Sequence, residues 1–158
     1  MGQGAGMPTF SDFGFTPLPH LIAMAVAYVL ALPIGWNREQ EERSAGLRTF
    51  PLVAVATCGL IEGTESLTAD SPEAMARIIE GLITGMGFIG GGAILRLENS
   101  VKGTATAASL WITGAIGVAV GVGSFDVAVL LSLVTVVTLW ALPPLKKLTK
   151  DDKKSRGE

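Results

Sequence analysis

Arg77 and Glu80 are ionisable residues inside an otherwise apolar stretch of the sequence, MARIIEGLITGMGFIGGGAIL, which runs from Met75 to Leu95. They are three residues apart, so on a helix their side chains lie close enough to form an ion pair. Ionisable groups at membrane depth are rare and mark functional sites. Two interpretations stay open: a structural ion pair at the membrane interface, or a pair that lines a cavity or binds a partner.

The same stretch is rich in glycine, with five glycines among the eight residues from Gly85 to Gly92. In water each interior glycine costs a helix about 1 kcal/mol relative to alanine, whereas in a membrane glycine lets neighbouring backbones approach closely. We therefore expect this helix at the centre of a membrane bundle. Its helical spacing places Arg77, Gly81, Gly85 and Gly92 on one face, and Glu80, Thr84, Gly87 and Gly91 on an adjoining stripe.

A second polar surface is expected on the next apolar segment, where Thr106, Ser109, Thr113 and Gly117 follow at helical spacing. Such surfaces usually hold membrane helices together. The alternative is a narrow polar pocket against the glycine-rich helix. Trp111 points away from this surface.

The loop NREQEERSAGLRTF, from Asn37 to Phe50, holds three arginines and three glutamates. Exposed ion pairs contribute only about 0–1 kcal/mol each, so stability explains this cluster poorly. The loop is interpreted either as a salt-bridged cap beneath the bundle or as a docking surface for another protein.

The residues give no support for an enzyme. His20 is the one histidine and Cys58 the one cysteine, and no phosphate-binding GxxxxGK[ST] motif is present. We expect no catalytic residues, no metal site and no cofactor, with His20 as an interfacial side chain and Cys58 as a small buried one.

Composition favours a membrane protein. The chain has 158 residues, of which 49% are hydrophobic and 16% charged, against roughly 25% charged in soluble domains; its mean hydropathy is +0.49. The predicted fold is an all-α transmembrane bundle of five spans, with the glycine-rich third helix at its centre. The spans lie near Leu18–Trp36, Leu47–Leu67, Met75–Leu95, Thr104–Gly123 and Val127–Leu142.

Charge predicts the orientation, because lysine and arginine gather in cytoplasmic loops. Basic residues follow the first, third and fifth spans, and acidic residues predominate after the second and fourth. The prediction is an outer leader over 1–17, a membrane domain over 18–142 and a basic cytoplasmic tail over 143–158. The amino terminus is expected outside and the carboxyl terminus in the cytoplasm.

Several motifs resemble the MgtC/SapB family of bacterial inner-membrane proteins. These are IGWNRE at Ile34–Glu39, AGLRT at Ala45–Thr49, GLITGMGFIGGGAIL at Gly81–Leu95 and VKGTATAASLW at Val101–Trp111. The resemblance implies a membrane regulator linked to growth at low magnesium and, in pathogens, to virulence. It also implies F-type ATP synthase as a possible partner. The site residues that it implies are Arg38, Glu39, Gly46, Leu47, Arg48, Thr49, Arg77, Gly85, Gly87, Phe88, Gly90, Gly91, Gly103, Thr106, Ala107 and Trp111; the residue patterns add Arg43, Glu80, Gly81, Gly92, Ser109 and Thr113.

Two positions depart from the family pattern. Asn37 stands where a carboxylate is common, and Phe50 where a polar or histidine residue is common, which weakens a cation-binding role for the loop. Many members also carry a soluble domain after the last helix, and none is expected here. The leading hypothesis is a regulatory membrane protein that docks on a partner helix or a second copy, in contact with lipid and not with nucleic acid. The alternative is an oligomeric channel or carrier for divalent cations or protons.

Overall fold

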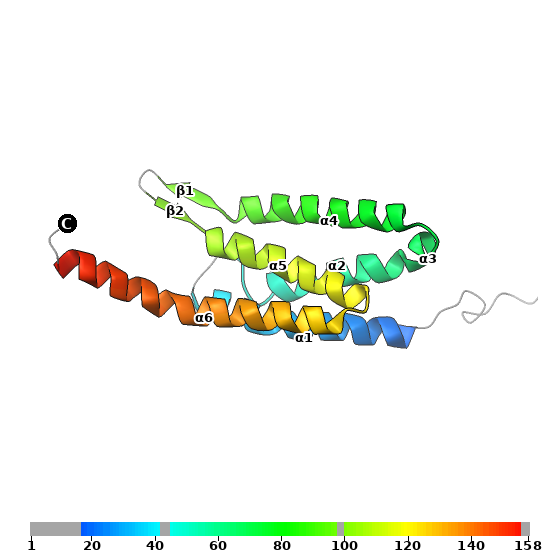
Figure 1. Ribbon diagram of the computed structural model, residues 1–158, viewed down its shortest axis with the longest axis horizontal. Helices are drawn as coiled ribbons and strands as arrows, with labels where there is room; N and C mark the ends of the chain where they lie inside the picture. The colour runs from blue at the N-terminus through cyan, green and yellow to red at the C-terminus, as the bar shows by residue number, and fades with distance from the viewer. Residues whose placement is uncertain (1–16, 42–44, 98–99, 156–158) are drawn as a thin grey trace, which may run out of the picture.

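Helices make up almost all of the computed structural model, which describes residues 17–41, 45–97 and 100–155. In chain order the elements are α1 (Pro17–Gln40), α2 (Thr49–Gly63), α3 (Glu65–Thr68), α4 (Pro72–Gly92), β1 (Leu95–Leu97), β2 (Ser100–Lys102), α5 (Thr104–Gly121) and α6 (Phe125–Ser155). The long helices run alongside one another, and the antiparallel β1–β2 hairpin projects at one end (Figure 1). The prediction of a helical bundle is confirmed, and the hairpin is an addition to it.

Local sequence explains where α4 and α5 begin. Ser71 caps α4 by accepting a hydrogen bond from the Ala74 amide at 3.3 Å, and Pro72 occupies the first turn, where its missing N–H costs nothing. Gly103 precedes α5 with φ of +90°, a conformation that glycine adopts without strain. A β-carbon there would lie 1.9 Å from the Ala93 carbonyl oxygen, so the hairpin can return to α5 only through glycine.

The central helix of the bundle is α5, which packs against α1, α2, α4 and α6. Its polar surface is internal: Thr106, Ser109 and Thr113 are buried. The Ser109 hydroxyl donates to the Ala105 carbonyl at 2.7 Å and the Thr113 hydroxyl to the Ser109 carbonyl at 2.8 Å. Below them a β-carbon at Gly117 would come within 2.0 Å of the Thr57 hydroxyl of α2. This surface therefore holds helices together, and it does so chiefly against α2.

The glycine-rich helix α4 lies at the edge of the bundle, against α5 and the short α3 (Figure 1). Gly90 packs on Ala107 of α5, and Met86 is buried beside Gly114. The other five glycines of α4 have no atom from outside their own turn of helix within 4 Å of an added β-carbon; they are Gly81, Gly85, Gly87, Gly91 and Gly92. The predicted central position of this helix is thus not confirmed, because the close backbone approaches are made by the glycines of α5.

Three helices in the described ranges are long and apolar enough to cross a membrane: α1, α5 and the Phe125–Leu142 part of α6. The chain is therefore a membrane protein. α2 is apolar but has 15 residues, a rise of about 22 Å against a hydrocarbon core of about 30 Å. α4 carries Arg77 and Glu80, and it is not among the three. The count of five spans therefore remains a prediction.

Candidate functional site

The described parts of the charged loop, 37–41 and 45–50, lie at the end of the bundle that also carries the β1–β2 hairpin, and we call them the folded loop. Asn37 and Arg38, in the last turn of α1, are buried, with 8% and 4% of their surface exposed. The Arg38 Nε donates to the Asn37 Oδ1 at 3.1 Å, and Nη2 donates to the same oxygen. A buried charge needs such hydrogen bonds to offset its desolvation. Arg38 is therefore held in place at this end of the bundle, and its role in binding a partner stays a prediction.

Glu39 connects this turn of α1 to the start of α2. Its Oε2 accepts a hydrogen bond from the Leu47 amide at 3.1 Å. The Gly46 carbonyl accepts from the amides of Thr49 and Phe50 at 3.0 and 3.2 Å, so the helical hydrogen bonding of α2 begins at Gly46. The carboxylate thus satisfies an amide at a helix amino terminus, where negative charge is favourable. A β-carbon at Gly46 would lie 1.9 Å from that carboxylate oxygen, so the contact requires glycine.

A cavity of about 270 Å³ opens beside this loop, between Arg38, the second hairpin strand and the start of α5. Lys102 contributes the second cation, and the segment 103–106 forms the remaining wall. Among the described residues that line the cavity there is no carboxylate. Within the described ranges, no group of three or more His, Cys, Asp or Glu residues is arranged to hold a metal ion.

The exposed surface of α4 is divided into two parts. Arg77, Gly81 and Gly85 face α2 across a groove of about 580 Å³, which we call the α2–α4 groove. On the other side lie Glu80, Thr84, Gly87 and Gly91, all exposed, which we call the free stripe of α4. Phe88 borders the free stripe with 85% of its surface exposed. Among the described residues no ion pair or hydrogen bond joins the Arg77 and Glu80 side chains, so the expected ion pair is not formed.

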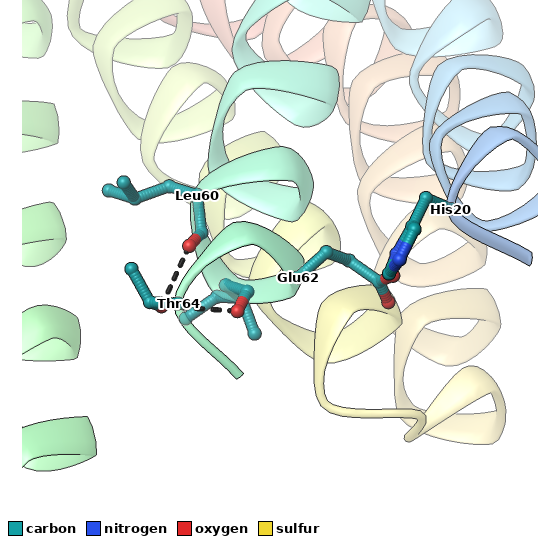
Figure 2. Close-up of polar contacts among 5 residues, drawn as sticks. His20, Leu60, Glu62 and Thr64 are labelled. Atoms are coloured by element: carbon teal, nitrogen blue, oxygen red, sulfur yellow. Dashed lines mark hydrogen bonds and ion pairs between the residues drawn. The ribbon is translucent and has the colours of Figure 1, made fainter. Parts of the chain in front are cut away.

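At the opposite end of the bundle, the α3 end, the His20 imidazole of α1 bonds to the Glu62 carboxylate of α2 (Figure 2). The sequence predicts His20 as an interfacial side chain and names no partner for it. The signal that could have found Glu62 is the topology, because His20 lies near the start of the predicted span Leu18–Trp36 and Glu62 near the end of the predicted span Leu47–Leu67. Antiparallel packing of the two spans brings these residues to a similar height. Beside them the Thr64 hydroxyl donates to the Leu60 and Ile61 carbonyls at 2.8 and 3.1 Å at the end of α2.

The predicted site residues therefore do not form one site. The buried residues are Arg38, Gly46, Gly90, Thr106, Ser109 and Thr113, and the half-buried residues are Leu47, Thr49, Gly103 and Ala107. The exposed residues are Glu39, Arg48, Arg77, Glu80, Gly81, Gly85, Gly87, Phe88, Gly91, Gly92 and Trp111. Arg43 lies outside the described residues. The structure groups them into the folded loop, the interior of α5 and the exposed surface of α4.

The sequence is similar to several known proteins. The family model described as MgtC family matches residues 24–148. The uncharacterised protein slr0014 of Synechocystis is 38% identical over 125 residues, which are 79% of this chain and 53% of that protein. Protein MgtC of Salmonella typhimurium is 36% identical over 116 residues, covering 73% of this chain and 49% of that protein. Protein SrpB of Synechococcus elongatus is 34% identical over 142 residues, covering 81% of this chain and 75% of that protein.

The chain spans about half the length of the first two relatives. No solved structure is similar to it at a significant level. The matched range contains the folded loop, the glycine-rich α4 and the central α5. Since the family model covers most of the sequence and the relatives are 34–38% identical over at least 73% of it, the chain is a membrane protein that belongs to the MgtC family.

Proposed function

We propose that this protein is a regulatory membrane protein that binds another membrane protein through the free stripe of α4. One observation carries the proposal. Gly87 and Gly91 have open space where a β-carbon would be, and Phe88 beside them is 85% exposed. Glycine at these positions lowers the stability of the helix, and no described residue packs on them to offset that cost. A partner helix could approach α4 closely there and cover Phe88.

The proposed contact surface contains fewer residues than the sequence patterns predicted. Thr106, Ser109 and Thr113 are buried in α5, and Arg38 is buried in the last turn of α1, so none of them belongs to the exposed surface that a partner helix would cover. Arg48 remains exposed at the start of α2 and is the candidate for a contact outside the membrane. The partner-binding surface is thus assigned to α4, with Arg48 as a secondary contact.

The proposed physiological setting is growth at low magnesium in the bacterial inner membrane. Its support is the family membership and the relatives named MgtC. The proposed partner is either a second copy of the chain or a membrane complex, with F-type ATP synthase as the specific candidate. Because this chain covers about half of those relatives, a virulence role is not included.

The test is affinity capture from native membranes with the unmodified chain and two variants. Gly91→Leu fills the free stripe and should abolish recovery of the partner, whether that is a second copy or ATP synthase subunits. Gly85→Leu adds the same side chain on the groove side of the same helix and is the matched control. Both positions have open space around the β-carbon, so both variants should insert and fold. Recovery of the same partner by Gly91→Leu would refute the proposal.

The proposed topology has five spans, with the amino terminus outside. α4 packs along the membrane-crossing helix α5, which supports placing α4 at membrane depth. The test uses a chain in which Cys58, the one cysteine, is replaced by alanine. Single cysteines are then introduced by Ser71→Cys and Lys102→Cys, before and after α4. An impermeant reagent should label the first from outside and the second from inside; labelling of both from one side would rule out the crossing of α4.

A second candidate is an ion channel or carrier for divalent cations or protons. It is favoured by a cavity of about 660 Å³ at the α3 end, where Glu62 and Glu65 line the space beside the central α5. Ion flux into liposomes that contain the purified protein separates this candidate from the first. Flux that is lost in Glu62→Gln would support it, and absence of flux from properly inserted protein would exclude it.

A further inference from the structure

The α2–α4 groove is apolar along most of its length. Val53, Ala56 and Leu60 form the α2 wall, and Leu82 and Ile89 belong to the α4 wall. The groove exists because Gly81 and Gly85 leave space where larger side chains would stand: a β-carbon at either would have no atom within 4 Å. Since α4 lies along the membrane-crossing helix α5, this apolar space lies at the depth of lipid chains.

Two polar side chains line the groove, and they differ in what they can still bind. The Thr57 hydroxyl donates to the Val53 and Ala54 carbonyls at 3.0 and 3.1 Å, so its proton is already used. The Arg77 guanidinium is exposed, and within the described residues it makes no ion pair or hydrogen bond. The described residues that line the groove include no carboxylate, and Glu80 lies on the free stripe. One end of an apolar groove therefore presents a guanidinium with five donors, for which the described part of the chain supplies no acceptor.

The length of the groove matches one leaflet of a bilayer. From Arg77 to Ile89 the helix rises about 18 Å, and half of the hydrocarbon core is about 15 Å thick. Arg77 lies in the second turn of α4, near the α3 end, where a flexible side chain reaches the level of lipid phosphates. The apolar part of the groove then runs from that level towards the middle of the membrane.

We propose that the α2–α4 groove binds one acyl chain of a membrane phospholipid, with the phosphate of that lipid paired to Arg77. Guanidinium and phosphate form strong, charge-assisted hydrogen bonds. A phospholipid supplies an apolar chain with an anion at its end, which are the two features that the groove and Arg77 present together. This site is separate from the free stripe. Lipid binding in the groove and partner binding on the free stripe can therefore be refuted independently of each other.

The experiment uses the full chain, purified in detergent and mixed with phosphatidylglycerol that carries a photoreactive diazirine on one acyl chain. Native mass spectrometry counts the lipids bound, and peptide mapping locates the cross-links. We expect cross-links on α2 and α4 residues of the groove. Diacylglycerol with the same chain serves as the probe without a phosphate. Replacing Arg77 by glutamine should weaken phosphatidylglycerol binding about fivefold, the worth of one basic group near the headgroups, and leave diacylglycerol binding unchanged.

Two variants obstruct the groove from opposite walls, Gly85→Leu from α4 and Leu60→Trp from α2. Each should lower acyl-chain binding by about tenfold or more. Gly87→Leu adds the same leucine on the free stripe and should bind lipid as the original chain does. Equal lipid occupancy in the original chain and both obstructing variants would overturn the proposal. It would also be overturned by cross-links that fall outside the groove, or by a cross-linked protein helix in place of the lipid.

Discussion

The Glu39 carboxylate accepts a hydrogen bond from the Leu47 amide at 3.1 Å, which ties the last turn of α1 to the residues just before α2. The two residues are eight positions apart in the sequence. Gly46 makes the contact possible, because any side chain there would occupy the position of the carboxylate. The family-like motif around these residues therefore has a structural role: it joins two helices at the hairpin end of the bundle.

Gly46→Ala should destabilise the protein by about 0.5–2 kcal/mol, the worth of a cap at a helix amino terminus, because it displaces the Glu39 carboxylate from the Leu47 amide. The measurement is thermal unfolding in detergent. In a Glu39→Ala background the same glycine change should cost much less, because the two changes remove one interaction. Gly63→Ala is the control, since a β-carbon at Gly63 meets nothing within 4 Å. Fully additive effects of the two changes would show that the contact is unimportant.

Arg38→Lys should destabilise the protein by about 1.5–3 kcal/mol, although it keeps the positive charge. The guanidinium donates from both Nε and Nη2 to the Asn37 oxygen in a buried site, and an ammonium group cannot reproduce that geometry. Arg48→Lys is the matched control, because Arg48 is exposed. Unfolding temperatures measured for both variants check this prediction, which fails if they are equal.

Gly117→Ala should be severely destabilising, by about 3 kcal/mol or more. The added β-carbon would lie 2.3 Å from the Ala54 carbonyl oxygen and 2.0 Å from the Thr57 hydroxyl, so α2 and α5 would have to separate. Gly87→Ala in α4 should instead be neutral, or stabilising by up to about 1 kcal/mol, since open space surrounds it and alanine is the better helix former. Yield and unfolding temperature of the two variants provide the comparison. Similar decreases of yield and unfolding temperature in the two variants would contradict the assignment of α5 as the central helix.

The His20–Glu62 contact should contribute little to stability. The His20 side chain is 41% exposed and that of Glu62 17%, so water screens their interaction. A double-mutant cycle with His20→Ala and Glu62→Gln should give a coupling of about 0–1 kcal/mol, decreasing as salt is added. A larger coupling that salt does not change would indicate that the pair is shielded from water, for example by a bound partner at the α3 end.

Much of the architecture could be predicted from the residues in order. Long apolar runs such as those of α1, α5 and α6 indicate membrane helices because the bilayer requires helices of this length. Helical spacing correctly placed Thr106, Ser109 and Thr113 on one face, and one of its two interpretations, helix packing, is the role that the structure gives them. The loop motif and the glycine-rich motif pointed to the family, which the comparisons confirm.

The tertiary structure alone decided which neighbour each helical face meets. Gly85 and Gly117 both lie on glycine-containing faces of apolar helices, yet the first faces an open groove and the second contacts α2. Periodicity tells which residues share a face, but in a membrane lipid and protein are equally apolar, so hydropathy does not tell which face is buried. The burial of Arg38 and the meeting of His20 with Glu62 likewise depend on contacts between helices. The sequence by itself therefore determined the helices and the family, and the packing of those helices determined the position of each candidate residue.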